Sequence, residues 1–342
     1  MYLYQNVCIR IFLDRNTEKS NNSVTKEIFS VYPTLLSILT YISPILKTDG
    51  DGHLTHIEIN KDPLPKNLTL DTYLDAINFT LYTRENPTNG DIIRLNDVAS
   101  VRKSHWNATK QTIIITHGWT HSGENPVCTT IRDAFLKVRD CNVIILDWSE
   151  IADDLVYSVV AKIVPYVAIR AASFINFMRI GAGLQTSNLK IVGHSFGAHI
   201  AGLSAREVGK SSRVAEVIAL DPANVMFQHK KPGERVDESD AENVQIIHTC
   251  AGQFGYYLSA GTSDFYANDG RNQPGCGVDL LGICAHLRSY KFFAESITNP
   301  KGFLGTRADG ATAYMGGATP DPNAKGTYYF KTNSQYPYAL DG

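Results

Sequence analysis

Short runs of branched apolar residues recur along this chain, each bounded by polar, glycine or proline positions. A short, continuous apolar run is typical of a strand in a parallel sheet that is buried on both of its faces. An earlier segment, Ile77–Thr83, alternates between apolar and polar residues and predicts a strand with one covered face. The predicted buried strands are Thr112–Thr116, Val143–Leu146, Leu189–Val192, Val214–Leu220 and Val244–Ile247.

The segments between these strands have the spacing of helices. They are Thr129–Arg139, Ala152–Ile180 and Ala198–Arg206, and Pro165 predicts a kink or break in the second of them. Strands that alternate with helices indicate an α/β fold with a doubly wound, mostly parallel sheet. The site of such a fold lies at the carboxyl ends of its strands.

The first 65 residues differ in composition from the rest of the chain. Residues 49–65 are rich in glycine, aspartate and proline, which predicts a linker, so we expect residues 1–65 to be an extension and residues 66–342 one domain. An apolar stretch at residues 26–46 is similar to part of a signal sequence. A loosely packed extension is an alternative, and so is a membrane anchor, which Pro33 and Pro44 disfavour.

The length and charge of the chain limit the classes of function that it can have. The chain has 342 residues, 43% of them hydrophobic, which is enough for one large core. A net charge of −2 without any block of like charges indicates no nucleic-acid partner. The charged fraction of 19% fits a secreted enzyme better than a disordered chain. Four glycosylation acceptors also favour secretion, at Asn21, Asn67, Asn78 and Asn107.

The sequence Gly193-His194-Ser195-Phe196-Gly197 completes a G-x-S-x-G motif between a predicted strand and a predicted helix. This is the context of a nucleophile elbow, a tight turn that lifts a serine hydroxyl above the sheet. Ser195 is therefore the candidate nucleophile, with an ordinary strand–helix turn as the alternative. An oxyanion hole needs backbone N–H donors, which we expect from Phe196 and, in the turn His117-Gly118-Trp119, from Trp119.

A serine nucleophile needs a base, and the base needs a carboxylate to orient it. In this fold the order along the chain is serine, acid, histidine. Asp221 ends a predicted strand after Ser195 and is the candidate acid; a turn-forming Asp-Pro pair is the alternative. Chain order leaves two candidates for the base, His286 and His248, and favours His286. His229 lies in a basic polar loop, where we expect it to be solvated.

The cysteine spacing permits two short disulfides. Cys128 and Cys141 bracket a predicted helix, and Cys276 and Cys284 bracket a loop of seven residues. Closing a loop of the first size stabilises a fold by about 2–3 kcal/mol where the geometry permits. Buried reduced thiols are the alternative, and the pairing of Cys8 and Cys250 stays open.

An acidic segment between the last two predicted strands contains Asp237 and Asp240. Carboxylates at this spacing could hold a calcium ion, but a solvated acidic turn is the simpler interpretation of the sequence alone. The chain contains no dinucleotide fingerprint and no P-loop, so the predicted chemistry requires no cofactor.

Together these residues resemble the pancreatic-lipase family of animal lipases, particularly its insect members, from about Ile77 to Leu340. The motifs that carry the resemblance are Ile115–Trp119, Asn142–Ser149, Val192–Gly202, Ile218–Ala223, Asp264–Cys276, Cys284–Tyr290 and Phe293–Ser296. The resemblance implies a single α/β-hydrolase domain. It also implies Ser195, Asp221 and His286 as the catalytic triad, with Trp119 and Phe196 as the oxyanion pair.

The same resemblance implies the disulfides Cys128–Cys141 and Cys276–Cys284, the second of which closes a lid. It strengthens the prediction of a structural calcium ion at Asp237 and Asp240. The chain stops after one domain, so we expect neither a C-terminal β-sandwich nor docking of colipase.

The lid holds only residues 277–283, and the loop at residues 251–263 is also short, as in the phospholipase A1 branch of the family. We therefore expect a secreted lipid-ester hydrolase of phospholipase A1 or acylglycerol lipase type, acting at a membrane, micelle or emulsion surface. Phe254, Tyr256, Tyr257 and Leu258 are expected to form an apolar rim there, or else a buried hairpin. The alternatives are a catalytically silent lipid-binding or yolk-type storage protein and a protein-interaction module.

Overall fold

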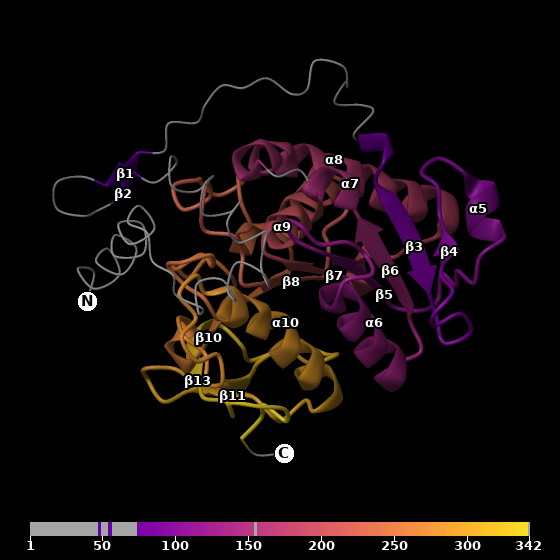
Figure 1. The fold of residues 1–342 in the computed structure, drawn as a ribbon. Helices are drawn as coiled ribbons and strands as arrows, with labels where there is room; N and C mark the ends of the chain where they lie inside the picture. Colours follow the sequence, from indigo (N-terminus) through magenta and orange to yellow (C-terminus); the bar gives the residue numbers. More distant parts are fainter. Residues whose placement is uncertain (1–46, 49–53, 57–73, 154–155, 341–342) are drawn as a thin grey trace, which may run out of the picture. The chain divides into compact units, whose positions relative to one another are not determined.

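The computed structural model describes residues 47–48, 54–56, 74–153 and 156–340 (Figure 1). Strands β1 (Lys47–Thr48) and β2 (Leu54–His56) pair in a small antiparallel sheet of their own, and β2 falls within the predicted linker. The predicted signal-like stretch, Cys8, Asn21 and Asn67 lie outside the described residues. From residue 74 onward, apart from residues 156–158, the described chain forms one compact unit around a large sheet.

The large sheet has eleven strands in the order β12-β11-β13-β10-β9-β8-β7-β5-β6-β3-β4 within the described chain. The strands from β13 to β6 are parallel: β5 (Thr112–Thr116), β6 (Asn142–Asp147), β7 (Leu189–His194), β8 (Glu216–Leu220), β9 (Asn243–His248), β10 (Ser263–Ala267) and β13 (Gly326–Phe330). Antiparallel strands complete the two edges: β3 (Asn78–Tyr82), β4 (Asp91–Ile92), β11 (Leu304–Thr306) and β12 (Thr312–Tyr314). The predicted α/β-hydrolase fold, with its doubly wound and mostly parallel sheet, is confirmed.

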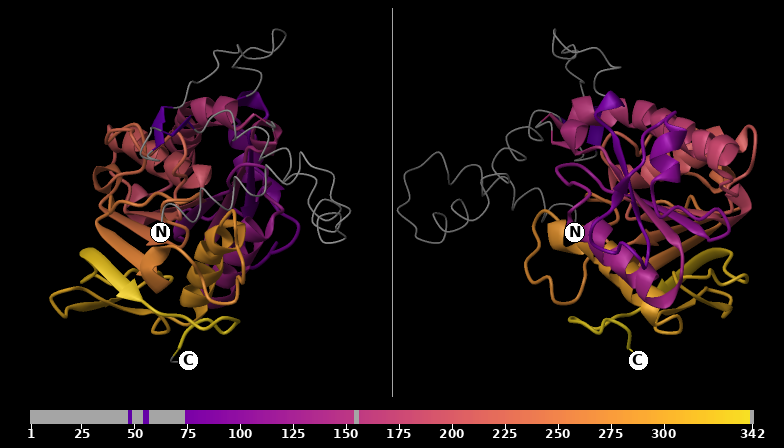
Figure 2. Two further views of the ribbon diagram at one scale, coloured as in Figure 1. Left: turned by 60° about the vertical axis from the view of Figure 1, so that its left-hand side comes forward. Right: turned by 90° about the vertical axis from the view of Figure 1, so that its right-hand side faces the viewer.

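Helices cover both faces of the sheet (Figure 2). Helices α6 (Pro126–Val138) and α10 (Ile283–Thr298) lie on one face, while α8 (Tyr157–Ala182) and α9 (Phe196–Gly209) lie on the other. The remaining short elements are α5 (Val98–Arg102), α7 (Ser149–Ala152), η1 (Thr186–Asn188), η2 (Glu238–Asp240) and η3 (Asn268–Gly270). The strand order thus brings the carboxyl ends of β5, β7 and β8 side by side.

The register explains why the central runs are apolar throughout. Ile114 lies opposite Ile144 on one side and Ile191 on the other, and all three are buried. Ile113 belongs to the core cluster with Phe135 of α6, on the face that α6 and α10 cover. Since successive side chains alternate between faces, Ile113 and Ile114 pack against different helical layers. A strand between two layers therefore needs no polar face.

Helix α8 contains Pro165 and continues through it, so the predicted break is absent. It is long and apolar enough to cross a membrane by length and composition, but 61% of its most apolar window is buried in the described structure. Phe174 of this helix stacks on Phe79 of β3 with ring centroids 3.7 Å apart. These contacts are those of a core helix.

Candidate active site

Ser195 occupies a strained turn between β7 and α9. Its φ of 59° and ψ of −119° lie in a region that side chains other than glycine rarely adopt. The flanking glycines are required because a Cβ on Gly193 would lie 2.0 Å from the carbonyl oxygen of Gly197, and one on Gly197 would lie 2.5 Å from that of His117. The predicted strand–turn–helix context of a nucleophile elbow is therefore present.

The turn after β5 passes directly beside this serine. A Cβ on Gly118 would lie 2.8 Å from the Cβ of Ser195. His117 is buried, and its Nε2 lies 2.9 Å from Oδ1 of Asp147. Burial opposes the ionisation of Asp147, but hydrogen bonds from His117 and Ser149 prevail and lower its pKa to about 2. The turn that carries Trp119 is thus held in place by a carboxylate from the next strand.

Asp221 and His286 meet at the end of β8. Nδ1 of His286 lies 2.6 Å from Oδ2 of Asp221, and the Asp221 side chain is fully buried. The other oxygen of Asp221 accepts hydrogen bonds from the backbone N–H groups of Thr249 and Cys250, at 2.7 and 3.0 Å. The backbone N–H of Ser195 donates to the carbonyl of Leu220, the residue before Asp221. The acid, the histidine and the elbow are therefore neighbours.

His248 is not available as a base. It is fully buried, with Nε2 at 2.8 Å from Asp264 and Nδ1 at 2.9 Å from the carbonyl oxygen of Tyr256. Its ring also stacks on Tyr266, with centroids 4.1 Å apart. Both ring nitrogens are therefore engaged, and His286 is the histidine that reaches Asp221. His229 is exposed, as its polar surroundings predicted.

Two histidines beside the site went unnoticed in the sequence. The ring of His194 lies 4.4 Å from the ring of His286, and its Nε2 lies 3.2 Å from the His286 carbonyl oxygen. The ring of His121 stacks on His194 as well, with centroids 6.0 Å apart. Burial lowers the pKa of His121 to about 4 and that of His194 well below its usual value, with further lowering by neighbouring histidines. Both rings are therefore neutral near pH 7. In the sequence, the only indication of this cluster is the position of His194 inside the G-x-S-x-G motif.

A cavity of about 550 Å³ opens beside the turn that carries Trp119. Its lining is polar or charged throughout and consists of Thr120, His121, Ser122, Asn125, Ser149, Glu150 and Asp153. Trp119 itself is half-buried, and Phe196 is fully buried. Polar groups can therefore be accommodated next to the candidate oxyanion site.

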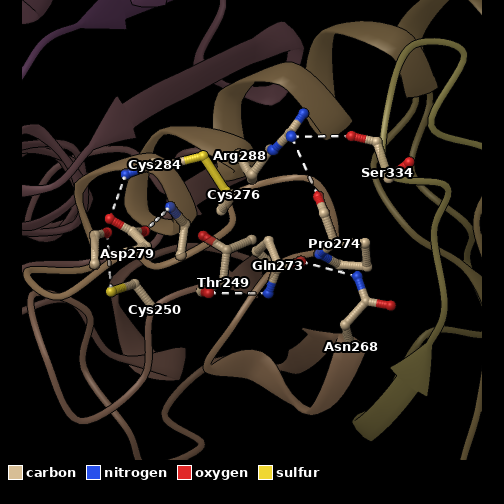
Figure 3. The surroundings of a disulfide bond; sticks show 12 residues. Thr249, Cys250, Asn268, Gln273, Pro274, Cys276, Asp279, Cys284, Arg288 and Ser334 are labelled. Atoms are coloured by element: carbon tan, nitrogen blue, oxygen red, sulfur yellow. Dashed lines mark hydrogen bonds between the residues drawn. A yellow bond between two sulfur atoms is a disulfide. The ribbon is translucent and has the colours of Figure 1, made fainter.

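The Cys276–Cys284 disulfide is present and closes the lid loop, residues 277–283, immediately before His286 (Figure 3). Cys128 and Cys141 are both free and buried, so the disulfide implied for them is wrong. Helix α6 begins at Pro126 and places Cys128 in its first turn, whereas Cys141 follows its far end. The ten steps from Cys128 to Val138 rise by about 15 Å along the helix, whereas bridged Cα atoms lie within about 7 Å. Cys250 is a third buried thiol.

Asp237 and Asp240 form a capping box around η2. Asp237 accepts hydrogen bonds from the N–H and hydroxyl of Ser239, and Asp240 accepts one from the N–H of Asp237. The guanidinium group of Arg206 lies 3.3 Å from the carboxylate of Asp240, and that of Arg235 lies 3.5 Å from the carboxylate of Asp237. Oxygen donors suit calcium, but these are already engaged. Calcium stays a prediction, and no catalytic step is assigned to it.

In sequence, the chain is similar to known lipases. A family model described as Lipase matches residues 56–327. The pancreatic triacylglycerol lipase of Cavia porcellus is 34% identical over 271 residues, which cover 73% of this chain and 57% of that protein. Pancreatic lipase-related protein 2 of Bos taurus is 34% identical over 68% of this chain and 53% of its own. The chain thus spans little more than half the length of these relatives.

Inactive pancreatic lipase-related protein 1 of Homo sapiens is also 34% identical, over 66% of this chain and 52% of its own. Among solved structures, the butyrate-bound esterase Est2 of Thermogutta terrifontis aligns with a TM-score of 0.32 and 15% identity, over 52% of this chain and 69% of that one.

Proposed function

Because the chain belongs to the lipase family, we propose that it is a carboxylic ester hydrolase acting on lipid esters through Ser195, Asp221 and His286. The observation that carries the proposal is the 2.6 Å contact between His286 and the buried Asp221, next to a serine in a strained elbow. An acidic residue that orients a histidine beside a serine is the arrangement of a serine hydrolase.

The chemistry follows from these positions. His286 takes the proton of the Ser195 hydroxyl while the oxygen attacks the ester carbonyl. Asp221 holds the imidazole and stabilises the imidazolium that forms. Backbone N–H groups of Trp119 and Phe196 hold the oxyanion, since Phe196 begins α9 and the first N–H groups of a helix point out of its end. The alcohol leaves with the proton of His286, and water then hydrolyses the acyl-enzyme by the same steps.

Exposed apolar side chains near His286 support action at a lipid surface. Val278 and Leu280 of the lid loop are 88% and 68% exposed, although both are large apolar residues. Tyr257 and Leu258 are exposed as well, whereas Tyr256 is buried, so only part of the predicted apolar rim can reach a membrane. Apolar side chains of this kind insert into the boundary between headgroups and acyl chains.

Two features favour a phospholipase A1 over an acylglycerol lipase. The lid loop has seven residues, too short for a long helical cover, and the cavity beside Trp119 is lined by polar groups. A polar headgroup fits such surroundings better than a third acyl chain does. Hydrolysis of phosphatidylcholine vesicles and of a triglyceride emulsion by the same preparation tests this preference. Cleavage of the triglyceride alone would overturn it.

Labelling with a fluorophosphonate tests the hydrolase itself, with Ser195→Ala as the control. We expect one equivalent of probe on Ser195 and none on the variant. The same experiment tests the alternative that the sequence left open, a catalytically silent lipid-binding protein. An unlabelled wild-type protein that still binds vesicles would favour that candidate and exclude the hydrolase.

Secretion is part of the proposal. The Cys276–Cys284 disulfide supports it, because disulfides persist in oxidising compartments. Asn78 and Asn107 are exposed and accessible to glycosylation. Loss of mass from the secreted protein after treatment with an N-glycosidase would support this part, and an unchanged mass would count against glycosylation.

A further inference from the structure

The lid loop contains one side chain that turns inward. Asp279 lies between the exposed Val278 and Leu280, yet it is only partly exposed and its carboxylate faces the start of α10 (Figure 3). Its Oδ2 accepts a hydrogen bond from the N–H of Ala285 at 2.8 Å, and Oδ1 one from Cys284 at 3.3 Å. The first N–H groups of a helix have no partner within the helix, so Asp279 satisfies two of them.

Gly282, the N-cap residue of α10, has no side chain that could do this. It is held to the loop by its own N–H, which donates to the carbonyl oxygen of Asp279 at 3.0 Å. The carbonyl oxygen of Gly282 in turn accepts the N–H of His286 at 2.8 Å. The chain of hydrogen bonds therefore runs from Asp279 through the first turn of α10 to the proposed base.

We propose that Asp279 is a positioning residue for His286, acting through the first turn of α10. The inference rests on the proposed function. It has two physical parts: the cap fixes where the imidazole meets Asp221, and the carboxylate offsets the positive end of the helix dipole, which disfavours the imidazolium formed in each cycle.

Other groups near His286 bear on the same equilibrium. They are the carboxylate of Asp221 after β8, the ring of His194 at the end of β7, the ring of His121 after β5, the Cys250 thiol and, on α10 itself, Tyr290. Arg288 of α10 points away, toward the carbonyl oxygens of Pro274 and Ser334. A variant of Asp279 replaces none of these groups, and the only one of them on which its charge acts directly is the Cys250 thiol, whose pKa burial and nearby carboxylates already raise.

The test measures kcat and KM for a soluble p-nitrophenyl ester between pH 5 and 9 in wild-type protein, Asp279→Ala and Asp279→Asn. Asp97→Ala is the matched control, because Asp97 caps α5 by accepting the N–H groups of Ala99 and Ser100. In Asp279→Ala we expect kcat to fall about tenfold or more with little change in KM, since small misplacements of a catalytic group are costly.

Asp279→Asn keeps an acceptor oxygen and loses the charge. It should recover part of kcat while the acid limb of the pH profile moves to lower pH by about 0.2–0.7 unit. Asp97→Ala should keep both the wild-type kcat and the wild-type acid limb. The inference is overturned if the acid limb of the pH profile of Asp279→Asn lies at the same pH as in wild-type protein, whatever the kcat of Asp279→Ala. A cap that only holds the structure in place would leave the pH of this limb unchanged.

A second measurement distinguishes failure of this inference from failure of the proposed function. If the wild-type protein hydrolyses no ester, the hydrolase proposal fails. The titration of the His286 imidazole by NMR then decides the inference: a lower midpoint in Asp279→Asn than in wild-type protein supports it, and an equal midpoint overturns it.

Discussion

Nδ1 of His286 lies 2.6 Å from Oδ2 of Asp221, although 65 positions separate the two residues in the chain. The contact depends on where α10 begins, because His286 lies in the first turn of that helix and the loop after β10 brings this turn to the end of β8. The other oxygen of Asp221 is held by two backbone N–H groups, so the carboxylate cannot rotate away from the imidazole. A side chain fixed in this way dictates which nitrogen of His286 carries the proton.

Asp221→Asn should therefore abolish most activity without unfolding the protein. The amide oxygen can keep the bonds from Thr249 and Cys250, but the NH₂ group would then face Nδ1 of His286 and impose the wrong tautomer. We expect kcat to fall by about 10⁴-fold. Asp264→Asn makes the same change at the buried His248 pair and should lower stability while kcat is retained. Equal losses of kcat in both variants would contradict the assignment of the acid.

His286→Ala and His248→Ala separate the two candidate bases. We expect the first to abolish turnover and fluorophosphonate labelling with little effect on the melting temperature. The second removes a buried ring bonded at both nitrogens and should cost about 1–3 kcal/mol of stability, because Asp264 loses its histidine partner and the carbonyl oxygen of Tyr256 loses its donor. Thermal melts and turnover assays on both proteins are the measurement, and the reverse pattern would overturn the assignment.

Gly118→Ala tests whether the turn beside Ser195 forms the oxyanion hole. The new methyl group would lie 2.8 Å from the Cβ of Ser195 and 3.1 Å from the carbonyl oxygen of His194, so the turn must shift. A displaced oxyanion donor costs about 10²–10³-fold in kcat. The control is Gly209→Ala at the end of α9, where a Cβ would meet nothing within 4 Å. That variant should keep full activity, and a Gly118→Ala enzyme as active as the control would exclude this turn.

The fold and the order of the reactive residues were predictable because both depend on local patterns. Strands such as Thr112–Thr116 are buried at every position and β-branched throughout, since two helical layers cover them. Ser195 and Asp221 follow such strands directly, and parallel strands place their carboxyl ends at one edge. The choice between His286 and His248 was not local, because it depends on where α10 packs.

The cysteines and Asp279 show where a local pattern misleads. Cys128 and Cys141 close a loop of a length that permits a disulfide, but a helix lies between them and holds the two residues at its opposite ends. Asp279 carries no signal in the sequence, and only the fold of its loop reveals the bonds to Cys284 and Ala285. Contacts of this kind depend on the path of the chain in three dimensions, which residue spacing alone does not give.

His199 makes the stability of the protein sensitive to acid. Its Nε2 donates to the carbonyl of Ala223, and its Nδ1 accepts the N–H of Val236, which only the neutral ring can do. Burial, with the charge of Arg235 adding to it, lowers the pKa of His199 to about 3. In the unfolded chain the pKa returns to about 6.5. Between pH 6.5 and 3, the unfolded state therefore binds a proton that the folded state does not bind. Stability from this group is complete above pH 6.5 and is lost as the pH falls toward 3.

At pH 5 this group should already cost about 2 kcal/mol of the free energy of unfolding relative to neutral pH. Urea unfolding at pH 7 and pH 5 measures the loss in wild-type protein and in His199→Gln, whose amide keeps a donor and an acceptor but does not titrate. We expect the loss to be about 2 kcal/mol smaller in the variant. His229→Gln, at an exposed histidine, is the control and should lose as much as wild-type protein. If all three proteins lose the same free energy, His199 carries a proton in the folded state and the hydrogen-bond assignment is wrong.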